Sequence, residues 1–171
     1  SICFSKRATG RYSEIKKPIL KNKLKKTNKS ILILGGGVAG LAASAELIRF
    51  GHKVTLFEKH KSLGGMLNQG IPVFRLPRKI IEKEIKQITS LGIKIELNKS
   101  VSSSKEIEKL SNKFDAVICA MGTLKPNILN EDFSNNSSVE NGLNFLLRVN
   151  EKNNHYVGKN VIVIGGGYTA M

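Results

Sequence analysis

The chain has 171 residues, 40% of them hydrophobic, which is typical of a globular domain with an apolar core. No stretch approaches the roughly 20 apolar residues that cross a bilayer, so no membrane span is predicted. Residues 1–29 carry much of the net charge of +15, because ten basic residues against one acid give +9 there. No nucleic-acid-binding motif is recognisable in this segment, so no nucleic-acid partner is expected.

The two cysteines, Cys3 and Cys119, are too few and too far apart for a disulfide framework or a metal cluster. This use of cysteine is typical of the reducing cytoplasm, where we expect the protein to act. Cys119 lies in an apolar run and is predicted to be a buried core residue. We predict no metal ligands, and no side chain that acts as a catalytic acid, base or nucleophile.

The first predicted unit is a strand, a turn, a helix and a second strand. Residues 30–34, SILIL, form a short apolar run that breaks at three glycines. Residues 38–50 then repeat apolar side chains at helical spacing up to Gly51, which favours the end of a helix. Residues 53–58, KVTLFE, are predicted to be the second strand, and they complete a β-α-β unit.

The rest of the chain continues this alternation after a long loop predicted at residues 59–77. Helices are predicted at residues 78–91, 102–113 and 140–150, the second of them with a serine cap. Strands are predicted at residues 93–97, 114–120 and 159–164, of which 114–120 is expected to be buried, and residues 123–139 are predicted to be irregular. Such alternation is typical of an α/β fold with a doubly wound, mainly parallel sheet of Rossmann type.

Residues 35–40, GGGVAG, fit the dinucleotide-binding pattern G-x-G-x-x-G between the first strand and the first helix. In this pattern Gly35 makes the tight turn, Gly37 lets the backbone approach a pyrophosphate, and Gly40 lets the helix pack on the strand. The helix N-terminus offers its N–H groups to the anion. Glu58 follows about 20 residues later, where a carboxylate accepts ribose hydroxyls and disfavours a 2′-phosphate. We therefore predict FAD or NAD at this turn.

The stretch KVTLFEKHKSLGGMLNQGIPVFRLPRKIIEKEI, residues 53–85, resembles the FAD-containing NAD(P)H oxidoreductases typified by the small (beta) subunit of bacterial glutamate synthase. Relatives in this family include the NADPH-oxidising half of dihydropyrimidine dehydrogenase and the NADPH-binding subunits of ferredoxin oxidoreductases. The most specific motif of this resemblance is GIPVFRLP, residues 70–77. The whole resemblance covers residues 30–171.

The resemblance implies that FAD binds at the first glycine turn, with its adenosine ribose on Glu58. It implies that the doublet Gly64-Gly65 brings backbone close to the cofactor, that Arg75 lies near the flavin nucleotide, and that Val101 lies near the adenine. The FAD contacts implied in this way are Gly35, Gly36, Gly37, Val38, Ala39, Gly40, Glu58, Gly65, Met66, Arg75 and Val101.

Two later stretches resemble the path into a second Rossmann domain, which binds NAD(P)H. FDAVICAMGT, residues 114–123, resembles the exit from the FAD domain and contains Gly122 in an A-x-G pattern. VIVIGGGYTAM, residues 161–171, resembles a second G-x-G-x-x-[GA] turn, which implies a site for the NAD(P)H pyrophosphate. The contacts implied at this turn are Gly165, Gly167, Tyr168, Thr169 and Ala170.

The resemblance also implies a domain organisation. Residues 1–29 resemble a basic linker from a missing upstream iron-sulfur domain, residues 30–125 the first part of an FAD-binding domain, and residues 126–171 a connector with the truncated start of an NAD(P)H-binding domain. Iron-sulfur clusters are expected only on the missing upstream region, because the single thiol of Cys3 cannot supply the four ligands that a cluster usually takes. The isolated chain is expected to be inactive.

In the resembled family a hydride passes from NAD(P)H to FAD, and single electrons leave through iron-sulfur clusters. The implied function is an electron-input flavoprotein whose partner is the large subunit of glutamate synthase or another electron acceptor. Alternatives are the same module serving ferredoxin, sulfur compounds or a pyrimidine, a non-catalytic truncated binding protein, and a flavin monooxygenase. Residues 64–70, GGMLNQG, contain no cysteine pair, which argues against disulfide reductase chemistry.

Overall fold

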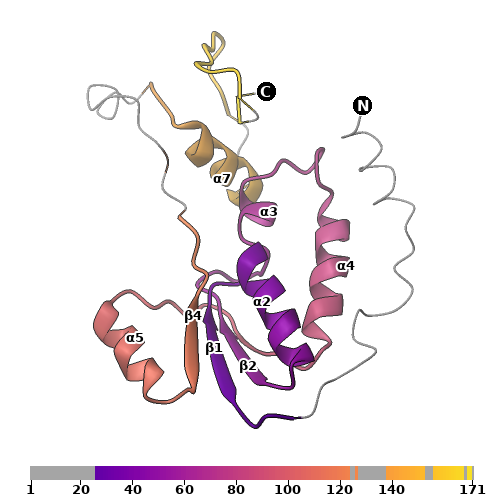
Figure 1. Cartoon of the computed structure of the whole chain (residues 1–171). Coiled ribbons are helices and arrows are strands. Elements are labelled where there is room, and N and C mark those ends of the chain that lie inside the picture. The colour runs from indigo at the N-terminus through magenta and orange to yellow at the C-terminus, as the bar shows by residue number, and fades with distance from the viewer. Residues whose placement is uncertain (1–25, 124–125, 127–137, 153–155, 168, 171) are drawn as a thin grey trace.

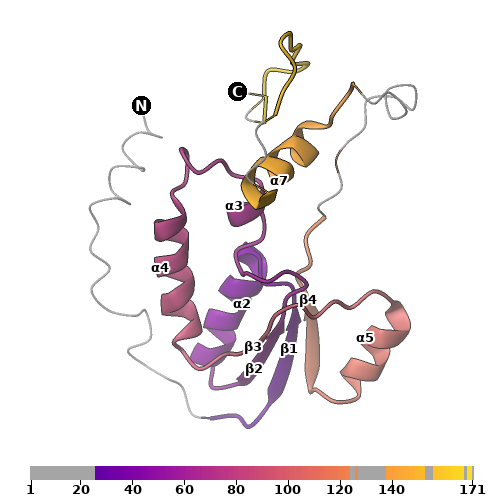
Figure 2. The same cartoon turned by 180° about the vertical axis from the view of Figure 1, so that it is seen from behind.

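A computed structural model describes residues 26–123, 126, 138–152, 156–167 and 169–170. A four-stranded parallel sheet forms its centre, with helices on both faces (Figure 1 and Figure 2). In the order β3-β2-β1-β4, the strands are β1 (Ser30–Leu34), β2 (Lys53–Phe57), β3 (Lys94–Glu96) and β4 (Ala116–Cys119). The predicted α/β fold of Rossmann type is confirmed.

β1 occupies the middle of the sheet because it is apolar on both faces. It pairs in parallel with β2, where Ile33 lies opposite Leu56, and with β4, where Ile33 lies opposite Ile118. Successive side chains of a strand point to opposite faces. Ile33 accordingly packs into one hydrophobic core, while Leu32 and Leu34 pack into the other. These three side chains are at most 1% exposed, as expected for a strand that is covered on both sides.

Two helices, α2 (Val38–Arg49) and α4 (Arg78–Thr89), cover one face of the sheet, and α5 (Ser104–Ser111) covers the other (Figure 1). α2 and α4 were expected from their periodicity and α5 as a serine-capped helix, and all three are confirmed. The hydroxyl of Ser103 accepts a hydrogen bond from the N–H of Glu106, so the predicted serine cap is present. A backbone φ of +86° at Gly51 follows the end of α2 and favours glycine there.

Two further helices, α3 (Met66–Gln69) and α7 (Gly142–Lys152), pack against each other beyond the carboxyl ends of the strands (Figure 1). α7 confirms the helix expected at residues 140–150. α3 lies within residues 59–77, where an irregular loop is predicted, so that prediction was wrong in part. A helix of four residues is too short to show a hydrophobic period, and it forms only where contacts from other elements hold it.

Cys119 is exposed rather than buried, so the prediction for this residue was wrong. It ends β4, which is the last strand in the sheet order and pairs with β1. Ala116 is also exposed, and Val117 and Ile118 are half-buried. The strand predicted at residues 114–120 therefore has the expected position but not the expected burial. In the described part of the chain, β4 is an edge strand and lacks the second neighbour that buries a central one.

The strand predicted at residues 159–164 does not form, so this prediction was wrong. Its apolar side chains are 59–90% exposed, namely those of Val161, Ile162, Val163 and Ile164. A strand is stable only when its N–H and C=O groups pair with a neighbouring strand. No strand of the described structure lies in register with this run.

Some predictions fall outside the described residues. They concern most of the linker predicted at residues 1–29, most of the irregular segment at residues 123–139, and Tyr168. Within the described part, no helix is both long enough and apolar enough to cross a membrane. Within the same part, no group of three or more His, Cys, Asp or Glu side chains is placed to hold a metal ion.

Asp115 fastens the start of β4 to the start of β1. Its Oδ2 accepts hydrogen bonds from the N–H and the hydroxyl of Ser30 over 2.8 and 2.9 Å, and its Oδ1 accepts one from Nζ of Lys29 over 3.0 Å. These hydrogen bonds, that of the Ser30 N–H foremost, lower the pKa of Asp115 from 3.8 to about 2. The charged carboxylate is therefore favoured in the folded state.

We predict that Asp115→Ala lowers the midpoint of urea unfolding. A carboxyl group whose pKa is lower in the folded chain contributes stability above its ordinary pKa and loses it as the pH falls through the folded value. The difference in unfolding midpoint between variant and wild type should therefore be largest above pH 3.8 and should shrink as the pH falls toward about 2. Unfolding curves at several pH values measure it, with Glu108→Ala on the exposed surface of α5 as the control. A difference that grows on acidification would contradict the prediction.

Candidate functional site

The first glycine turn joins β1 to α2 with no room for a side chain at two positions. A Cβ on Gly35, whose φ is +108°, would lie 2.4 Å from the carbonyl oxygen of Ala120. A Cβ on Gly40 would lie 1.8 Å from the carbonyl oxygen of Gly35. The N–H of Gly35 also donates to the carbonyl of Phe57 at the end of β2, over 2.8 Å. Gly122, with a φ of +67°, follows two residues after Ala120, so the predicted exit from the domain adjoins this turn.

The middle glycine of the pattern, Gly37, is half-buried at the N-terminus of α2 and leaves room for a Cβ. The nearest neighbour of a Cβ there would be Cα of Gly65 at 3.9 Å, which is an ordinary contact. Val38 and Ala39, the first residues of α2, are exposed beside it. The first N–H groups of a helix have no partner within the helix, and its dipole adds a partial positive charge. Free space and backbone donors therefore meet here, as an anionic pyrophosphate requires.

A second glycine pair closes the other side of this space. The N–H of Gly64 donates to the carbonyl of Gly36 over 2.8 Å, and a Cβ on Gly65 would lie 3.0 Å from Cα of Gly37. The φ angles of +110° and +49° at the pair favour glycine at both positions. The structure thus brings two separate glycine stretches into one backbone cradle. We call it the glycine cradle, and it comprises residues 35–40 and 64–65.

Glu58 lies directly after β2 and is 5% exposed. Its Oε2 accepts a hydrogen bond from the N–H of Gly36 over 2.7 Å, and its Oε1 accepts one from the N–H of His60 over 2.9 Å. A carboxylate has about four acceptor positions, so these two hydrogen bonds leave capacity for ribose hydroxyls. The same side chain therefore fixes the glycine cradle and keeps an acceptor where the sequence predicts the ribose.

The segment GIPVFRLP, residues 70–77, forms a tight loop after α3. The N–H groups of Arg75 and Leu76 donate to the carbonyl of Pro72 over 3.0 and 3.1 Å, which folds the centre of the segment into a turn. Arg75 is half-buried on this loop. Its contact with the flavin nucleotide stays a prediction, but the turn holds its backbone in one place.

Met66 and Val101 are the remaining contacts that the sequence implies for FAD. Met66 is 42% exposed, and its methyl group lies over the backbone of Gly70. Val101 packs, half-buried, against the core on the α5 face. Its segment runs beside Glu58, because the N–H of Lys99 donates to the carbonyl of Glu58 over 2.8 Å. The cofactor contacts of both side chains stay predictions.

The second glycine turn is not brought to the first one. Gly165, with a φ of +119°, begins it, and the N–H of Ala170 donates to the carbonyl of Gly167 over 2.9 Å. Thr169 lies beside Gly142 at the start of α7, where its methyl group is 3.2 Å from the place of a Cβ. In Figure 1 this segment runs past α7, apart from the sheet.

Two side chains near the candidate site were missed by the sequence analysis, Arg78 and Asn150. Both donate hydrogen bonds to carbonyl groups at the C-terminal end of α3. The signal for Arg78 is its place as the first residue of a helix, where the dipole disfavours a cation. Asn150 gives no local signal, because the carbonyl of Gln69 that accepts its hydrogen bond lies 81 residues away in sequence.

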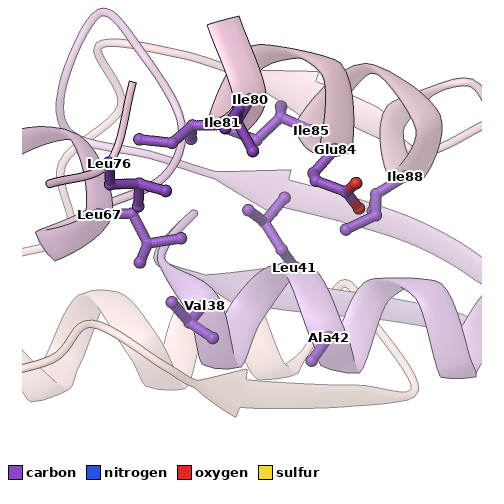
Figure 3. A pocket seen from close by; sticks show the side chains of 10 residues that line it. All are labelled: Val38, Leu41, Ala42, Leu67, Leu76, Ile80, Ile81, Glu84, Ile85 and Ile88. Atoms are coloured by element: carbon purple, nitrogen blue, oxygen red, sulfur yellow. The ribbon is translucent and has the colours of Figure 1, made fainter. Parts of the chain in front are cut away.

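An apolar cavity of about 240 Å³ lies between α2 and α4 (Figure 3). Leu41, Leu67 and Ile81 are among the nine apolar residues that line it, and Glu84 is the tenth lining residue. Such a lining offers no attraction to phosphate groups and adds an acid. The cavity adjoins the glycine cradle, with which it shares Val38, but its apolar lining does not suit phosphate groups, so we assign the dinucleotide to the cradle.

Comparison with known proteins gives a family from the sequence and a shared fold from the solved structures. The family model described as pyridine nucleotide-disulphide oxidoreductase matches residues 29–171. The chain is 36% identical, over 85% of its length, to an NAD-dependent dihydropyrimidine dehydrogenase subunit PreT homolog of Salmonella typhi. It is also 36% identical, again over 85% of its length, to the glutamate synthase [NADPH] small chain of Bacillus subtilis.

Among solved structures, Mycobacterium tuberculosis FprA in complex with NADPH shares the fold with a TM-score of 0.65 at 21% identity. The match covers 71% of this chain and 28% of FprA. The two relatives by sequence are matched over 35% and 31% of their own lengths. The chain therefore spans about a third of the length of the curated relatives that it matches.

We predict that alanine at Gly40 lowers the stability of the fold, whereas alanine at Gly37 weakens FAD binding and leaves the stability unchanged. Gly40→Ala should lower the free energy of unfolding by about 1–3 kcal/mol or more, because the new methyl group meets the Gly35 carbonyl. Gly37→Ala should leave it within about 0.5 kcal/mol of wild type, because the methyl group has room. The same methyl group occupies the space for a pyrophosphate, so Gly37→Ala should weaken the binding of FAD.

Urea unfolding curves and titration with FAD distinguish the two variants. Each is the other's control, since both add one methyl group to the same turn. A Gly37→Ala variant that binds FAD as wild type does would contradict the assignment of the pyrophosphate to this turn.

Proposed function

The chain belongs to the pyridine nucleotide-disulphide oxidoreductase family, and from this premise we propose that it is the FAD-binding part of an electron-input module that is reduced by NAD(P)H. The observation that carries the proposal is the glycine cradle with Glu58 beside it. The cradle combines space at Gly37, the N-terminus of α2 and a buried acceptor in one place. These groups suit the pyrophosphate and ribose of a dinucleotide.

The residues of the site fit FAD in the following roles. Backbone N–H groups of residues 37–40, at the N-terminus of α2, bind the pyrophosphate, Glu58 accepts the ribose hydroxyls, and Val101 borders the adenine. Gly65, Met66 and Arg75 approach the flavin side of the cofactor. When bound, FAD supplies the redox chemistry, since it takes a hydride from a nicotinamide and gives up electrons singly. The chain contributes binding and orientation.

We place the NAD(P)H site at the second glycine turn. Its backbone, at Gly165, Gly167, Tyr168, Thr169 and Ala170, is proposed to receive the pyrophosphate of NAD(P)H. Gly122 lies on the chain that leads from the first turn toward it. This turn needs a strand before it and a helix after it to act as such a site.

The electrons are proposed to leave through iron-sulfur clusters on a region outside this chain. Residues 64–70 contain no cysteine, so a disulfide exchange beside the flavin has no thiols to use there. The large subunit of glutamate synthase is the first candidate partner, because one relative is the small chain of that enzyme. A pyrimidine-reducing partner is the second, because another relative is a dihydropyrimidine dehydrogenase subunit. We propose that the protein acts in the cytoplasm.

The proposal is tested with the protein produced at its full encoded length. We predict that it binds FAD, identified after release by denaturation, and that NADH or NADPH bleaches the flavin absorbance without oxygen. The 171-residue chain is the length control and should show no turnover with NAD(P)H. Gly37→Ala in the full-length protein should lower the flavin content.

Three results would overturn the proposal in different ways. A full-length protein that binds no flavin but binds DNA in a salt-dependent manner would make it a binding protein. Rapid reaction of the reduced flavin with oxygen, together with hydroxylation of a substrate, would make it a monooxygenase. Turnover of NADPH by the 171-residue chain at the rate of the full-length protein would show that no further domain is needed.

A further inference from the structure

Hydrogen bonds from two separate elements converge on the C-terminal end of α3. The last carbonyl groups of a helix have no partner within that helix. Here the carbonyl of Leu67 in α3 and that of Ile71, two residues past the end of α3, accept hydrogen bonds from the guanidinium of Arg78 over 2.8 and 3.1 Å. The carbonyls of Gln69 and Ile71 accept hydrogen bonds from the side-chain amide of Asn150 over 2.7 and 3.4 Å. α3 is therefore held from outside at the end where it cannot hold itself.

Arg78 belongs to this arrangement rather than to its own helix. It is the first residue of α4, where the helix dipole disfavours a cation. Its guanidinium lies instead at the C-terminal end of α3, where a cation is favoured. Burial lowers the pKa of Arg78 below its ordinary value, as expected for a guanidinium that lies between segments of backbone. Its bond to Ile71 also closes the loop that carries Arg75.

Asn150 brings a distant part of the chain to the same place. It lies on α7, which packs against α3 and follows the strands of the sheet by more than 20 residues. Its side chain is partly buried, and the two carbonyls that it bonds are 81 and 79 residues away in sequence. A second asparagine of α7, Asn144, is exposed and offers a matched comparison on the same helix.

We propose that Asn150 is a positioning residue for the FAD site and acts through α3. α3 begins at Met66, directly after Gly65, so a shift of the helix moves one wall of the glycine cradle. Its four residues are too few to keep a helix in place by themselves. The inference rests on the proposed function, because it takes FAD to be the ligand of the cradle. It adds that α7, which precedes the second glycine turn in sequence, helps to position the glycine cradle.

The test is Asn150→Asp in the protein of full encoded length. The carboxylate replaces a donor with an acceptor opposite two carbonyl groups, so α3 loses this support. We expect the dissociation constant of FAD to rise about ten-fold and the visible circular dichroism of the bound flavin to change. In the FAD-free protein, amide hydrogen exchange of residues 64–71 should become faster, while β1 and β2 stay protected. Asn144→Asp, with the same change of charge, should leave all three measurements unchanged.

Asn150→Ala removes the donor without adding charge and should change all three measurements in the same direction. Wild-type values of FAD affinity and exchange in both Asn150 variants would overturn the positioning role and leave the proposed function intact. Faster exchange throughout the sheet, with a lower unfolding midpoint, would assign Asn150 to general stability and would also overturn it. If the wild-type protein binds no FAD, the proposed function and this inference fall together.

Discussion

The N–H of Gly36 donates to the buried carboxylate of Glu58 over 2.7 Å, and the candidate site depends on this hydrogen bond. A buried carboxylate is unfavourable unless donors satisfy it, and Gly36 and His60 supply two from the backbone. The bond links the first glycine turn to the end of β2. Leu63 packs so closely on Gly36 that a Cβ there would lie 2.4 Å from its side chain. The turn is thus fixed before any ligand arrives, which reduces the ordering that binding requires.

The elements that could be predicted from sequence are those whose signal is local. β1, α2 and β2 follow from apolar runs, helical spacing and three glycines within 30 residues, and the turn from β1 into α2 supplies residues 35–40 of the glycine cradle. α4 and α5 follow from periodicity and a serine cap. The exposure of Cys119 could not be predicted in this way, because it depends on which strand lies beside β4. The run at residues 161–164 has the composition of a strand but no neighbour in the described structure.

The second wall of the cradle illustrates a different limit. Gly64 and Gly65 are visible in the sequence, but the helix that follows them is set by Arg78 and Asn150. In sequence Asn150 looks like an ordinary polar residue of an amphipathic helix, and Arg78 differs only in being a cation at the start of one. Their role arises from carbonyl groups that α3 leaves without partners, and such groups are known only once the helix is known. The wall at residues 35–40 therefore follows from a local motif. The wall at residues 64–65 depends on hydrogen bonds to α3 from side chains of two other helices, α4 and α7.

The two glycine turns show that a motif becomes a site only through its neighbours. At the first turn, β1 is paired on both sides, and Ala120 of the adjoining segment excludes a side chain at Gly35. At the second turn, Gly166 and Gly167 have no heavy atom within 4 Å of the place of a Cβ, and the preceding residues pair with no described strand. The same glycine pattern thus gives a rigid cradle in one place and an open turn in the other. The sheet supplies the rigidity, because the paired strand fixes the direction in which the helix N-terminus points.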